Sequence, residues 1–286
     1  MTTNNDINIK AQSFTIKNEL NHPINGEIRW KNNKTGSPLL IISHGFKAFK
    51  DWGFFPYIST IFADLDFITI CFNYSLNGVS NSNDQYDSPE KFAMNTVSAE
   101  LHDLHTILRN SNEILSSFQI AEKWSGEIFL LGHSLGAAIS ILTALESGKI
   151  NKLALWAPIA KIDRYSPRQK EKWRKDEKLK FTDNRTNTDL WMDVCFLDDI
   201  ENNKEKYNLP NAVSKLRMPL IIVHGKEDMT VKPRESEELA KSYDGKNLFY
   251  NIIESTGHTF GIEHPMEKTT SPLEKAIEIT NYYLKK

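Results

Sequence analysis

One strand-turn-helix segment near the middle of the chain constrains the fold more than any other feature. Residues 128–131 form a bulky apolar run, which is typical of a buried parallel strand. Gly-His-Ser-Leu-Gly follows at residues 132–136, and the small apolar residues after it favour a helix. Glycines at both ends leave room for a tight turn, which projects Ser134 from the carboxyl end of the strand, above the helix N-terminus. The segment predicts an exposed serine in the position of a nucleophile.

Strand and helix patterns alternate along most of the chain. Residues 13–17 and 24–31 alternate apolar and polar side chains, which predicts an antiparallel hairpin at the start of a sheet. Further strands are predicted at residues 39–42, 67–72, 128–131, 153–156, 220–223 and 248–253. Helices are predicted at residues 54–65, 92–109, 137–142, 233–243 and 271–284. The order predicts an α/β fold with a mostly parallel central sheet flanked by helices.

The regular alternation stops between residues 159 and 212. This segment is rich in charged residues, basic at first and acidic later. We expect residues 159–212 to form a small helical cap, inserted into one core domain made of residues 1–158 and 213–286. Acidic residues interrupt the basic run, which favours a solvated helix face over a nucleic-acid site.

Three aromatic residues of the expected cap are candidates for a substrate pocket. Trp173, Trp191 and Phe196 are interspersed among the charges of this segment. They either pack the cap onto the core or line a pocket between cap and core, because ligand sites are common at such junctions.

Composition bears on localisation and on partners. The chain has 35 Lys and Arg residues against 37 Asp and Glu residues, so no global field attracts nucleic acid or an anionic membrane. The first ten residues are polar and no run of 18 apolar residues occurs, so we expect a cytoplasmic protein without membrane insertion. We expect a monomer or a homodimer. Cys71 and Cys195 are too few for a disulfide framework or a zinc site.

A serine hydroxyl needs partners before it can act as a nucleophile. A histidine must accept its proton, and a carboxylate must hold that histidine in the correct tautomer. Asp228 follows the strand at 220–223 and His258 follows the strand at 248–253, so both are expected at the same sheet edge as Ser134. The competing acids are Glu227, Asp84 and Asp87, and the competing bases are His224 and His264.

Four stretches together resemble the α/β-hydrolase superfamily. They are Gly-His-Ser-Leu-Gly at 132–136, His-Gly-Phe at 44–46, His-Gly-Lys-Glu-Asp at 224–228 and Gly-His at 257–258. The resemblance covers nearly the whole chain. Within the superfamily, the His-Gly-Phe loop and the short cap are similar to small cinnamoyl or feruloyl esterases and to serine-aminopeptidase-like proteins.

The resemblance implies a catalytic triad of Ser134, Asp228 and His258, in the chain order of this superfamily. The spacing His-Gly-x-x-Asp selects Asp228 among the acids, and Gly-His after the last strand selects His258 among the bases. No metal ion or other cofactor is expected, because this chemistry needs none.

The resemblance also implies an oxyanion hole made by the backbone N–H groups of Phe46 and Leu135. Removing one such donor typically costs ~3 kcal/mol of transition-state stabilisation. Gly45 would let the loop backbone approach closely. We expect His44 and His133 to be structural. The loop at residues 72–78 departs from the superfamily pattern, since Asn73 and Leu76 stand where a charged residue is usual.

The expected activity is hydrolysis of a small-molecule carboxylic ester through an acyl-enzyme intermediate. Acyl thioesters and aminoacyl amides are alternative substrates on the same fold. A further alternative is a non-catalytic protein of this fold that binds a ligand in the same cleft. A secreted lipase is disfavoured, because a lipase lid is apolar and residues 159–212 carry many charges.

Overall fold

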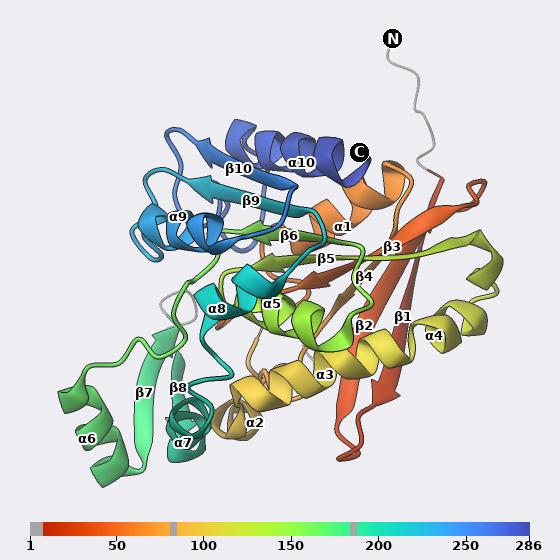
Figure 1. Cartoon of the computed structure of the whole chain (residues 1–286). Coiled ribbons are helices and arrows are strands. Elements are labelled where there is room, and N and C mark those ends of the chain that lie inside the picture. The colour runs from red at the N-terminus through yellow and green to blue at the C-terminus, as the bar shows by residue number, and fades with distance from the viewer. Residues whose placement is uncertain (1–7, 81–84, 184–187) are drawn as a thin grey trace.

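The computed structural model describes residues 8–80, 85–183 and 188–286. In this part of the chain, eight strands form one sheet in the order β1-β2-β4-β3-β5-β6-β9-β10 (Figure 1). β1 and β2 are antiparallel, β2 and β4 are antiparallel, and the remaining neighbours are parallel. The strands are β1 (Ile9–Lys17), β2 (Pro23–Lys31), β3 (Ser37–Ser43), β4 (Ile68–Phe72), β5 (Trp124–His133), β6 (Lys152–Trp156), β9 (Leu220–Gly225) and β10 (Leu248–Ile253).

Helices cover both faces of the sheet. One face packs against α1 (Phe55–Asp64) and α10 (Ser271–Leu284). The other packs against α3 (Val97–Arg109), α5 (Leu135–Ser147) and α9 (Pro233–Ser242). The expected α/β fold with a mostly parallel sheet is confirmed.

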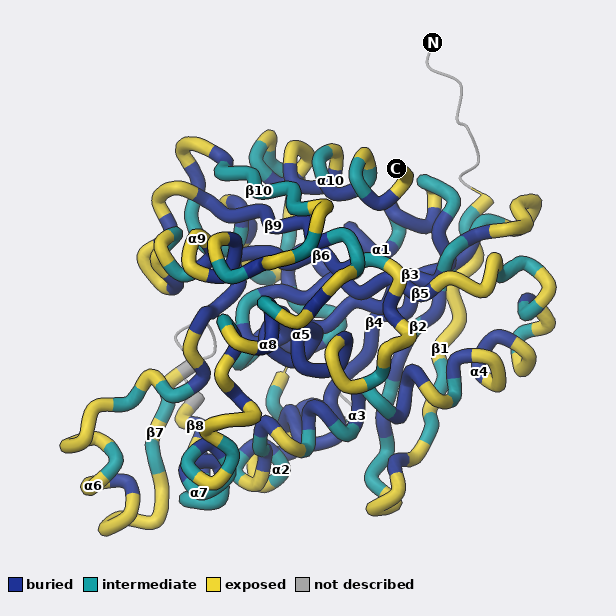
Figure 2. Tube along the Cα trace, viewed as in Figure 1, coloured by how far each residue is buried: buried dark blue, intermediate teal, exposed yellow. Residues whose placement is uncertain are grey.

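The central strands are apolar on both sides because both of their faces are covered. In β3, Leu39 and Ile41 belong to one core, and Leu40 and Ile42 belong to the other. All four side chains are fully buried, and the strands form the dark interior of Figure 2. Two short helices, α2 (Pro89–Met94) and α4 (Ser111–Ser117), flank α3 along the chain.

The segment between β6 and β9 contains strands as well as helices, which corrects the expectation of a helical cap. It holds α6 (Pro167–Asp176), β7 (Lys178–Asp183), β8 (Thr188–Asp193), α7 (Val194–Asn202) and α8 (Leu209–Lys215). β7 and β8 form an antiparallel two-stranded sheet of their own. Leu179 pairs with Met192 and Phe181 with Leu190, so the apolar residues have the two-residue period of strands. The many charges between them hid this alternation.

The segment between β6 and β9 has two parts, which lie in different places in the structure. The β7–β8 hairpin, α6 and α7 lie together beside the sheet, whereas α8 packs against α5 and α9 (Figure 1). We refer to residues 159–212 as the insertion. No helix in residues 8–80, 85–183 and 188–286 is long and apolar enough to cross a lipid bilayer.

Candidate active site

Ser134 lies in a strained turn between β5 and α5. Its backbone angles are φ 57° and ψ −117°, a conformation that non-glycine residues adopt only where the surrounding structure enforces it. The Ser134 N–H donates to the carbonyl of Trp156 on the neighbouring strand at 3.0 Å. The Ser134 hydroxyl has no hydrogen-bond partner among the described residues, His258 included. The turn presents this hydroxyl at the carboxyl edge of the sheet.

The two glycines of the turn are required by close backbone contacts. A Cβ at Gly132 would lie 2.5 Å from the Gly136 carbonyl oxygen. A Cβ at Gly136 would overlap the carbonyl oxygens of Ser43 and His44. The absence of both side chains lets α5 start directly at the end of β5 and lets β3 end against it.

The loop after β3 packs directly against this turn. A Cβ at Gly45 would lie 3.0 Å from both the His133 carbonyl oxygen and the Ser134 Cβ. The backbone N–H of Phe46 and that of Leu135 have no hydrogen-bond acceptor in the described part of the chain. Leu135 is the first residue of α5, where helix geometry leaves N–H groups unpaired. Two unpaired donors therefore flank the serine.

His44 contacts the same loop from the buried side. Its Nδ1 lies 3.0 Å from the Gly45 carbonyl oxygen, and its Nε2 lies 3.4 Å from the Asn77 amide nitrogen. Burial lowers the pKa of His44 to about 4. Asn73 also holds this region, because its side-chain oxygen accepts from the Lys50 N–H at 2.7 Å. The Asn73 side chain, an uncharged amide, thus ties the loop after β4 to the loop after β3.

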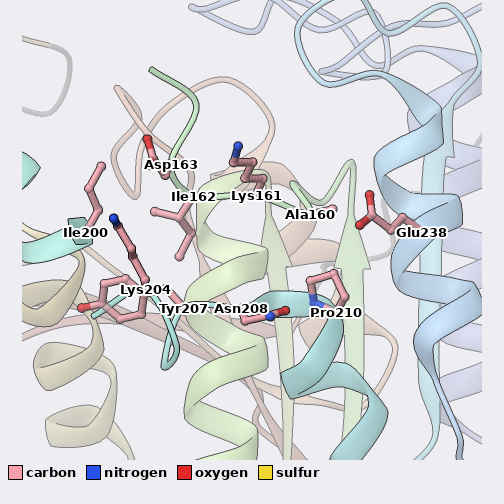
Figure 3. Close-up of a pocket in the computed structure, with 10 residues that line it drawn as sticks. All are labelled: Ala160, Lys161, Ile162, Asp163, Ile200, Lys204, Tyr207, Asn208, Pro210 and Glu238. Atoms are coloured by element: carbon pink, nitrogen blue, oxygen red, sulfur yellow. The ribbon is translucent and has the colours of Figure 1, made fainter. Parts of the chain in front are cut away.

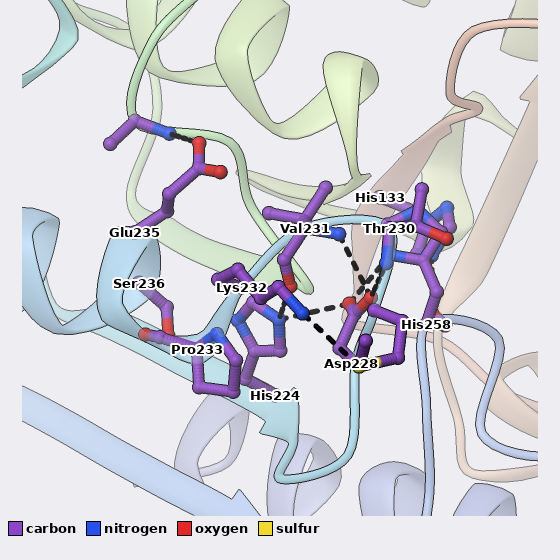
Figure 4. A network of polar contacts seen from close by, with 12 residues as sticks. His133, His224, Asp228, Thr230, Val231, Lys232, Pro233, Glu235, Ser236 and His258 are labelled. Atoms are coloured by element: carbon purple, nitrogen blue, oxygen red, sulfur yellow. Dashed lines mark hydrogen bonds and ion pairs between the residues drawn. The ribbon is translucent and has the colours of Figure 1, made fainter.

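Asp228 and His258 are joined by a short hydrogen bond. His258 Nδ1 lies 2.7 Å from Asp228 Oδ2 (Figure 4). The other carboxylate oxygen accepts from the N–H groups of Thr230 at 2.8 Å and Val231 at 2.9 Å. Burial alone would raise the pKa of Asp228, but hydrogen bonds from His224 and His258 hold it well below its usual value. Asp228 is an anion that fixes the orientation of His258.

His133 fixes the backbone of the His258 loop. Its Nε2 donates to the carbonyl oxygen of His258 at 2.9 Å, and the two rings lie 4.7 Å apart. Burial and the neighbouring His258 lower the pKa of His133 to about 3. The ring therefore acts as a neutral donor near pH 7.

Ser134 and His258 line the same cavity, which has a volume of about 640 Å³. Trp52 and His264 form one wall of it, with their rings stacked at 6.1 Å and an interplanar angle of 15°. Its full lining is Gly45, Phe46, Lys47, Ala48, Trp52, His133, Ser134, His258, Thr259, Ile262, Glu263 and His264. In the described chain, no cluster of three or more His, Cys, Asp or Glu side chains is arranged to hold a metal ion.

The three aromatic residues proposed for the pocket do not line this cavity. Trp173 is fully buried, stacks on Phe196 at 6.0 Å and donates from Nε1 to the Met192 carbonyl oxygen at 2.9 Å. Trp191 is 43% exposed on the outside of β8. Trp173 and Phe196 belong to the same apolar cluster as the α3 and α5 face of the sheet, so they pack the insertion onto the core, the first of the two alternatives. Their distance from Ser134 depends on how the insertion folds, which their position in the sequence does not reveal.

A second cavity of about 390 Å³ is lined almost entirely by the insertion, with Glu238 of α9 as its one lining residue from the core (Figure 3). It is lined by Ala160, Lys161, Ile162, Asp163, Ile200, Lys204, Tyr207, Asn208, Pro210 and Glu238. None of these residues was expected in the site from sequence, and Ser134 does not reach this cavity.

Of the competing acids and bases, His264 lines the cavity and the other described ones do not. Glu227 is exposed. Asp87 accepts a hydrogen bond from the Ser80 N–H at 2.7 Å, and Asp84 lies outside the described residues. His264 accepts from the Gly53 N–H at 2.8 Å. His224 is buried behind Asp228 and does not line the cavity.

Sequence reasoning missed Trp52 in the cavity wall and Phe181 beside the Phe46 loop. Trp52 gave no signal, because one aromatic residue before a helix has many possible roles. Phe181 of the insertion was hidden in the unrecognised β7 strand. Its ring lies 5.1 Å from that of Phe46, and Lys47 Nζ lies 3.4 Å from the Thr182 carbonyl oxygen. The β7–β8 hairpin therefore contacts the loop that carries the Phe46 amide.

One known family model matches the middle of the chain. Residues 90–188 match the family model described as serine aminopeptidase, S33. The matched stretch includes Ser134 but neither Asp228 nor His258. No curated protein sequence matches the chain.

Solved structures match the chain over nearly its whole length. Est1E from Butyrivibrio proteoclasticus with ferulic acid bound is 20% identical, with a TM-score of 0.68, covering 96% of this chain and 100% of that chain. Mouse alpha/beta hydrolase domain-containing protein 10 is 16% identical, with a TM-score of 0.71, covering 96% and 98%. The Pyrococcus furiosus esterase Pf2001 is 16% identical, with a TM-score of 0.63, covering 100% and 95%. These likenesses show the α/β-hydrolase fold.

Proposed function

We propose that this chain, a protein of the α/β-hydrolase fold, is a serine hydrolase that cleaves small carboxylic esters through an acyl-enzyme intermediate. One observation carries the proposal. The strained turn presents Ser134 to a cavity that His258 also lines, and His258 is hydrogen-bonded through Nδ1 to the buried anion Asp228. A structural serine would not need this conformation, nor a buried carboxylate aligned with the neighbouring imidazole.

In the proposed reaction each group has a role. Asp228 holds the proton of His258 on Nδ1, so Nε2 carries the lone pair and can accept the Ser134 proton. The Ser134 oxygen then attacks the acyl carbonyl carbon, and the carbonyl oxygen becomes an oxyanion. His258 returns the proton to the departing alcohol. Water attacks the acyl-enzyme by the same route, which releases the acid and regenerates Ser134.

The oxyanion is stabilised by the unpaired N–H groups of Phe46 and Leu135. Each such donor contributes ~3 kcal/mol in comparable sites. The N-terminus of α5 adds a favourable dipole beneath Ser134. Because Gly45 lies against the Ser134 turn, the Phe46 amide is held beside the reacting serine.

Ester substrates are favoured by the chemistry of the leaving group. An alcohol leaves the tetrahedral intermediate more readily than an amine, so an ester makes smaller demands on proton delivery. The cavity has room for a small molecule, and the Trp52–His264 wall offers apolar surface to one side of it. Acyl thioesters and aminoacyl amides are the alternative substrates of the same machinery.

A fluorophosphonate probe tests the serine hydrolase assignment. We expect covalent labelling of the native chain and no labelling of Ser134→Ala. Ser140→Ala is the matched control, because Ser140 lies on α5 with its hydroxyl bonded to the Gly136 carbonyl oxygen at 2.7 Å. A folded native chain that is not labelled would show a non-catalytic ligand-binding protein instead.

A substrate panel tests the ester assignment. Aryl and alkyl esters, acyl thioesters and aminoacyl amides are assayed with the native chain and with Ser134→Ala. We expect the highest kcat/KM on an ester. Preferential turnover of an aminoacyl amide or a thioester would replace the ester assignment and leave the serine hydrolase assignment intact.

A further inference from the structure

Asp228 has a second imidazole partner besides His258. His224, the fifth residue of β9, places its Nε2 3.0 Å from Asp228 Oδ2, the same oxygen that accepts from His258 Nδ1 at 2.7 Å (Figure 4). The two histidines approach this oxygen from different elements, since His258 lies in the loop after β10. Both side chains contact the buried Asp228 carboxylate, but of the two only His258 lines the cavity.

The surroundings of His224 assign its tautomer. Nε2 also lies 3.0 Å from the Val231 carbonyl oxygen. Both neighbours of Nε2 are acceptors, so Nε2 carries the proton. Nδ1 is buried and has no hydrogen-bond partner within the described residues. A proton on Nδ1 would be buried without an acceptor, which is costly. Nε2 of His224 is therefore the donor to Asp228 and to the Val231 carbonyl oxygen.

The donors around Asp228 use both oxygens of its carboxylate. Oδ1 accepts from the Thr230 and Val231 N–H groups, and Oδ2 accepts from the two imidazoles. His224 also closes the turn after Asp228, because it binds both the carboxylate and the Val231 carbonyl. The carboxylate is thus anchored to β9 independently of His258.

We infer that His224 is a positioning residue, which anchors the Asp228 carboxylate and shares its Oδ2 with His258. This inference rests on the proposed function only for its kinetic consequence. Sharing the oxygen has two effects on the reaction. The anchored carboxylate holds the His258 ring at a constant angle. The second donor also withdraws negative charge from the oxygen that faces His258, so removing it leaves more of that charge to act on His258.

Other charged groups near His258 must be considered for its pH response. His133 faces His258 with its ring at 4.7 Å, and its Nε2 contacts the His258 backbone. The remaining titratable groups that line the same cavity in the described structure are Lys47, Glu263 and His264. His224 differs from all of these because it acts on His258 through Asp228 alone.

Substitutions that keep or remove the donor test the inference. His224→Phe has a ring of similar size without a donor, whereas His224→Gln has an N–H group that can reach the same oxygen. Both kcat and kcat/KM are followed against pH with p-nitrophenyl acetate. We expect His224→Phe to lower kcat about 10-fold and to move the acid limb of the profile up by about one pH unit. His224→Gln should keep both kcat and the acid limb close to those of the native chain.

His105→Gln is the matched control for loss of a histidine. His105 lies on α3 and its Nε2 contacts Glu146 at 3.0 Å, on the surface and away from Asp228. We expect the acid limb of the pH profile of His105→Gln to coincide with that of the native chain. Equal loss of rate in His224→Phe and His224→Gln, with an unmoved acid limb in both, would overturn the inference and leave His224 as a packing residue.

Nuclear magnetic resonance gives a readout that needs neither turnover nor a folded His224→Phe variant. In ¹⁵N-histidine-labelled native protein, we expect His224 as the Nε2–H tautomer and a low-field proton on His258 Nδ1. A His224 found with its proton on Nδ1 would overturn the inference even if the enzyme is active. Conversely, failure of fluorophosphonate labelling with the expected tautomer would refute the proposed function and leave the positioning of Asp228 by His224 intact.

Discussion

The ring of Phe181, on β7 of the insertion, packs edge-on against the ring of Phe46 at a centroid distance of 5.1 Å. Phe46 contacts Phe92 of α2 on another side, at 5.7 Å. The backbone N–H of Phe46 is one of the two proposed oxyanion donors. The insertion therefore bears on the reaction through the position of this loop, as well as through any contact with substrate.

Removing the Phe181 ring should reduce catalysis more than binding. An aromatic pair contributes about 0.5–1.5 kcal/mol beyond its buried area, and a misplaced oxyanion donor costs up to ~100-fold in kcat. We expect Phe181→Ala to lower kcat 10- to 100-fold (order of magnitude) with little change in KM, and Phe181→Leu to lose less. Trp191→Ala, on the exposed side of the same hairpin, is the control. Equal kcat values for Phe181→Ala and Trp191→Ala would contradict the coupling.

Gly136→Ala should displace the loop that carries Phe46. The new Cβ would overlap the carbonyl oxygens of Ser43 and His44, and a backbone contact cannot relax as a side chain can. We expect fluorophosphonate labelling to slow by ~100-fold or more. Gly148→Ala is the control, because Gly148 has φ 59° at the end of α5 but no atom within 4 Å of a new Cβ. It should lose stability without losing labelling, and equal labelling rates in the two variants would disprove the steric argument.

Asp228→Asn should abolish most activity while the chain remains folded. Asparagine can still accept from the Thr230 and Val231 N–H groups, but its amide offers a donor to His258 Nδ1 and so favours the wrong tautomer. We expect kcat to fall about 10⁴-fold, measured on the preferred ester with circular dichroism as the check on folding. Glu227→Gln, one residue away and exposed, should retain native activity. The reverse result would identify Glu227 as the acid.

Glu100 should make the stability of the chain depend on pH. Its side chain is buried on α3, Oε1 accepts from Asn95 Nδ2 at 2.8 Å, and Oε2 has no partner among the described residues. Burial raises the pKa of Glu100 to about 8. A raised folded-state pKa means that its stabilising contribution is present below about pH 4.5 and is lost as pH rises through about 8.

Glu100→Gln keeps the oxygen that Asn95 binds and removes the titration. Between pH 5 and 8, the free energy of unfolding of the native chain should fall relative to this variant, by up to about 1.4 kcal/mol per pH unit. Urea unfolding at several pH values measures this difference. For Glu113→Gln, on the exposed side of α4, the free energy of unfolding should change with pH in the same way as that of the native chain. Parallel curves for Glu100→Gln as well would show that the buried carboxyl does not titrate in this range.

The Ser134 turn and the β7–β8 hairpin differ in how well the sequence predicts them. The Ser134 turn was predictable because the glycines and the apolar strand before them act locally, within a few residues. Asp228 and His258 were predicted at one sheet edge because parallel strands end on the same side. The β7–β8 hairpin was missed, since Leu179, Phe181, Leu190 and Met192 alternate within a segment whose charges suggested a solvated helix.

The sequence by itself determined the α/β architecture and the placement of Ser134, Asp228 and His258 at one edge of the sheet, because these depend on local periodicity and on strand direction. Only the tertiary structure decided the partners of these residues. Whether Trp173 or Trp52 lines the cavity, and whether His224 reaches Asp228, depends on packing between segments far apart in the chain. Such packing is set by side-chain shape in three dimensions, which no local pattern records.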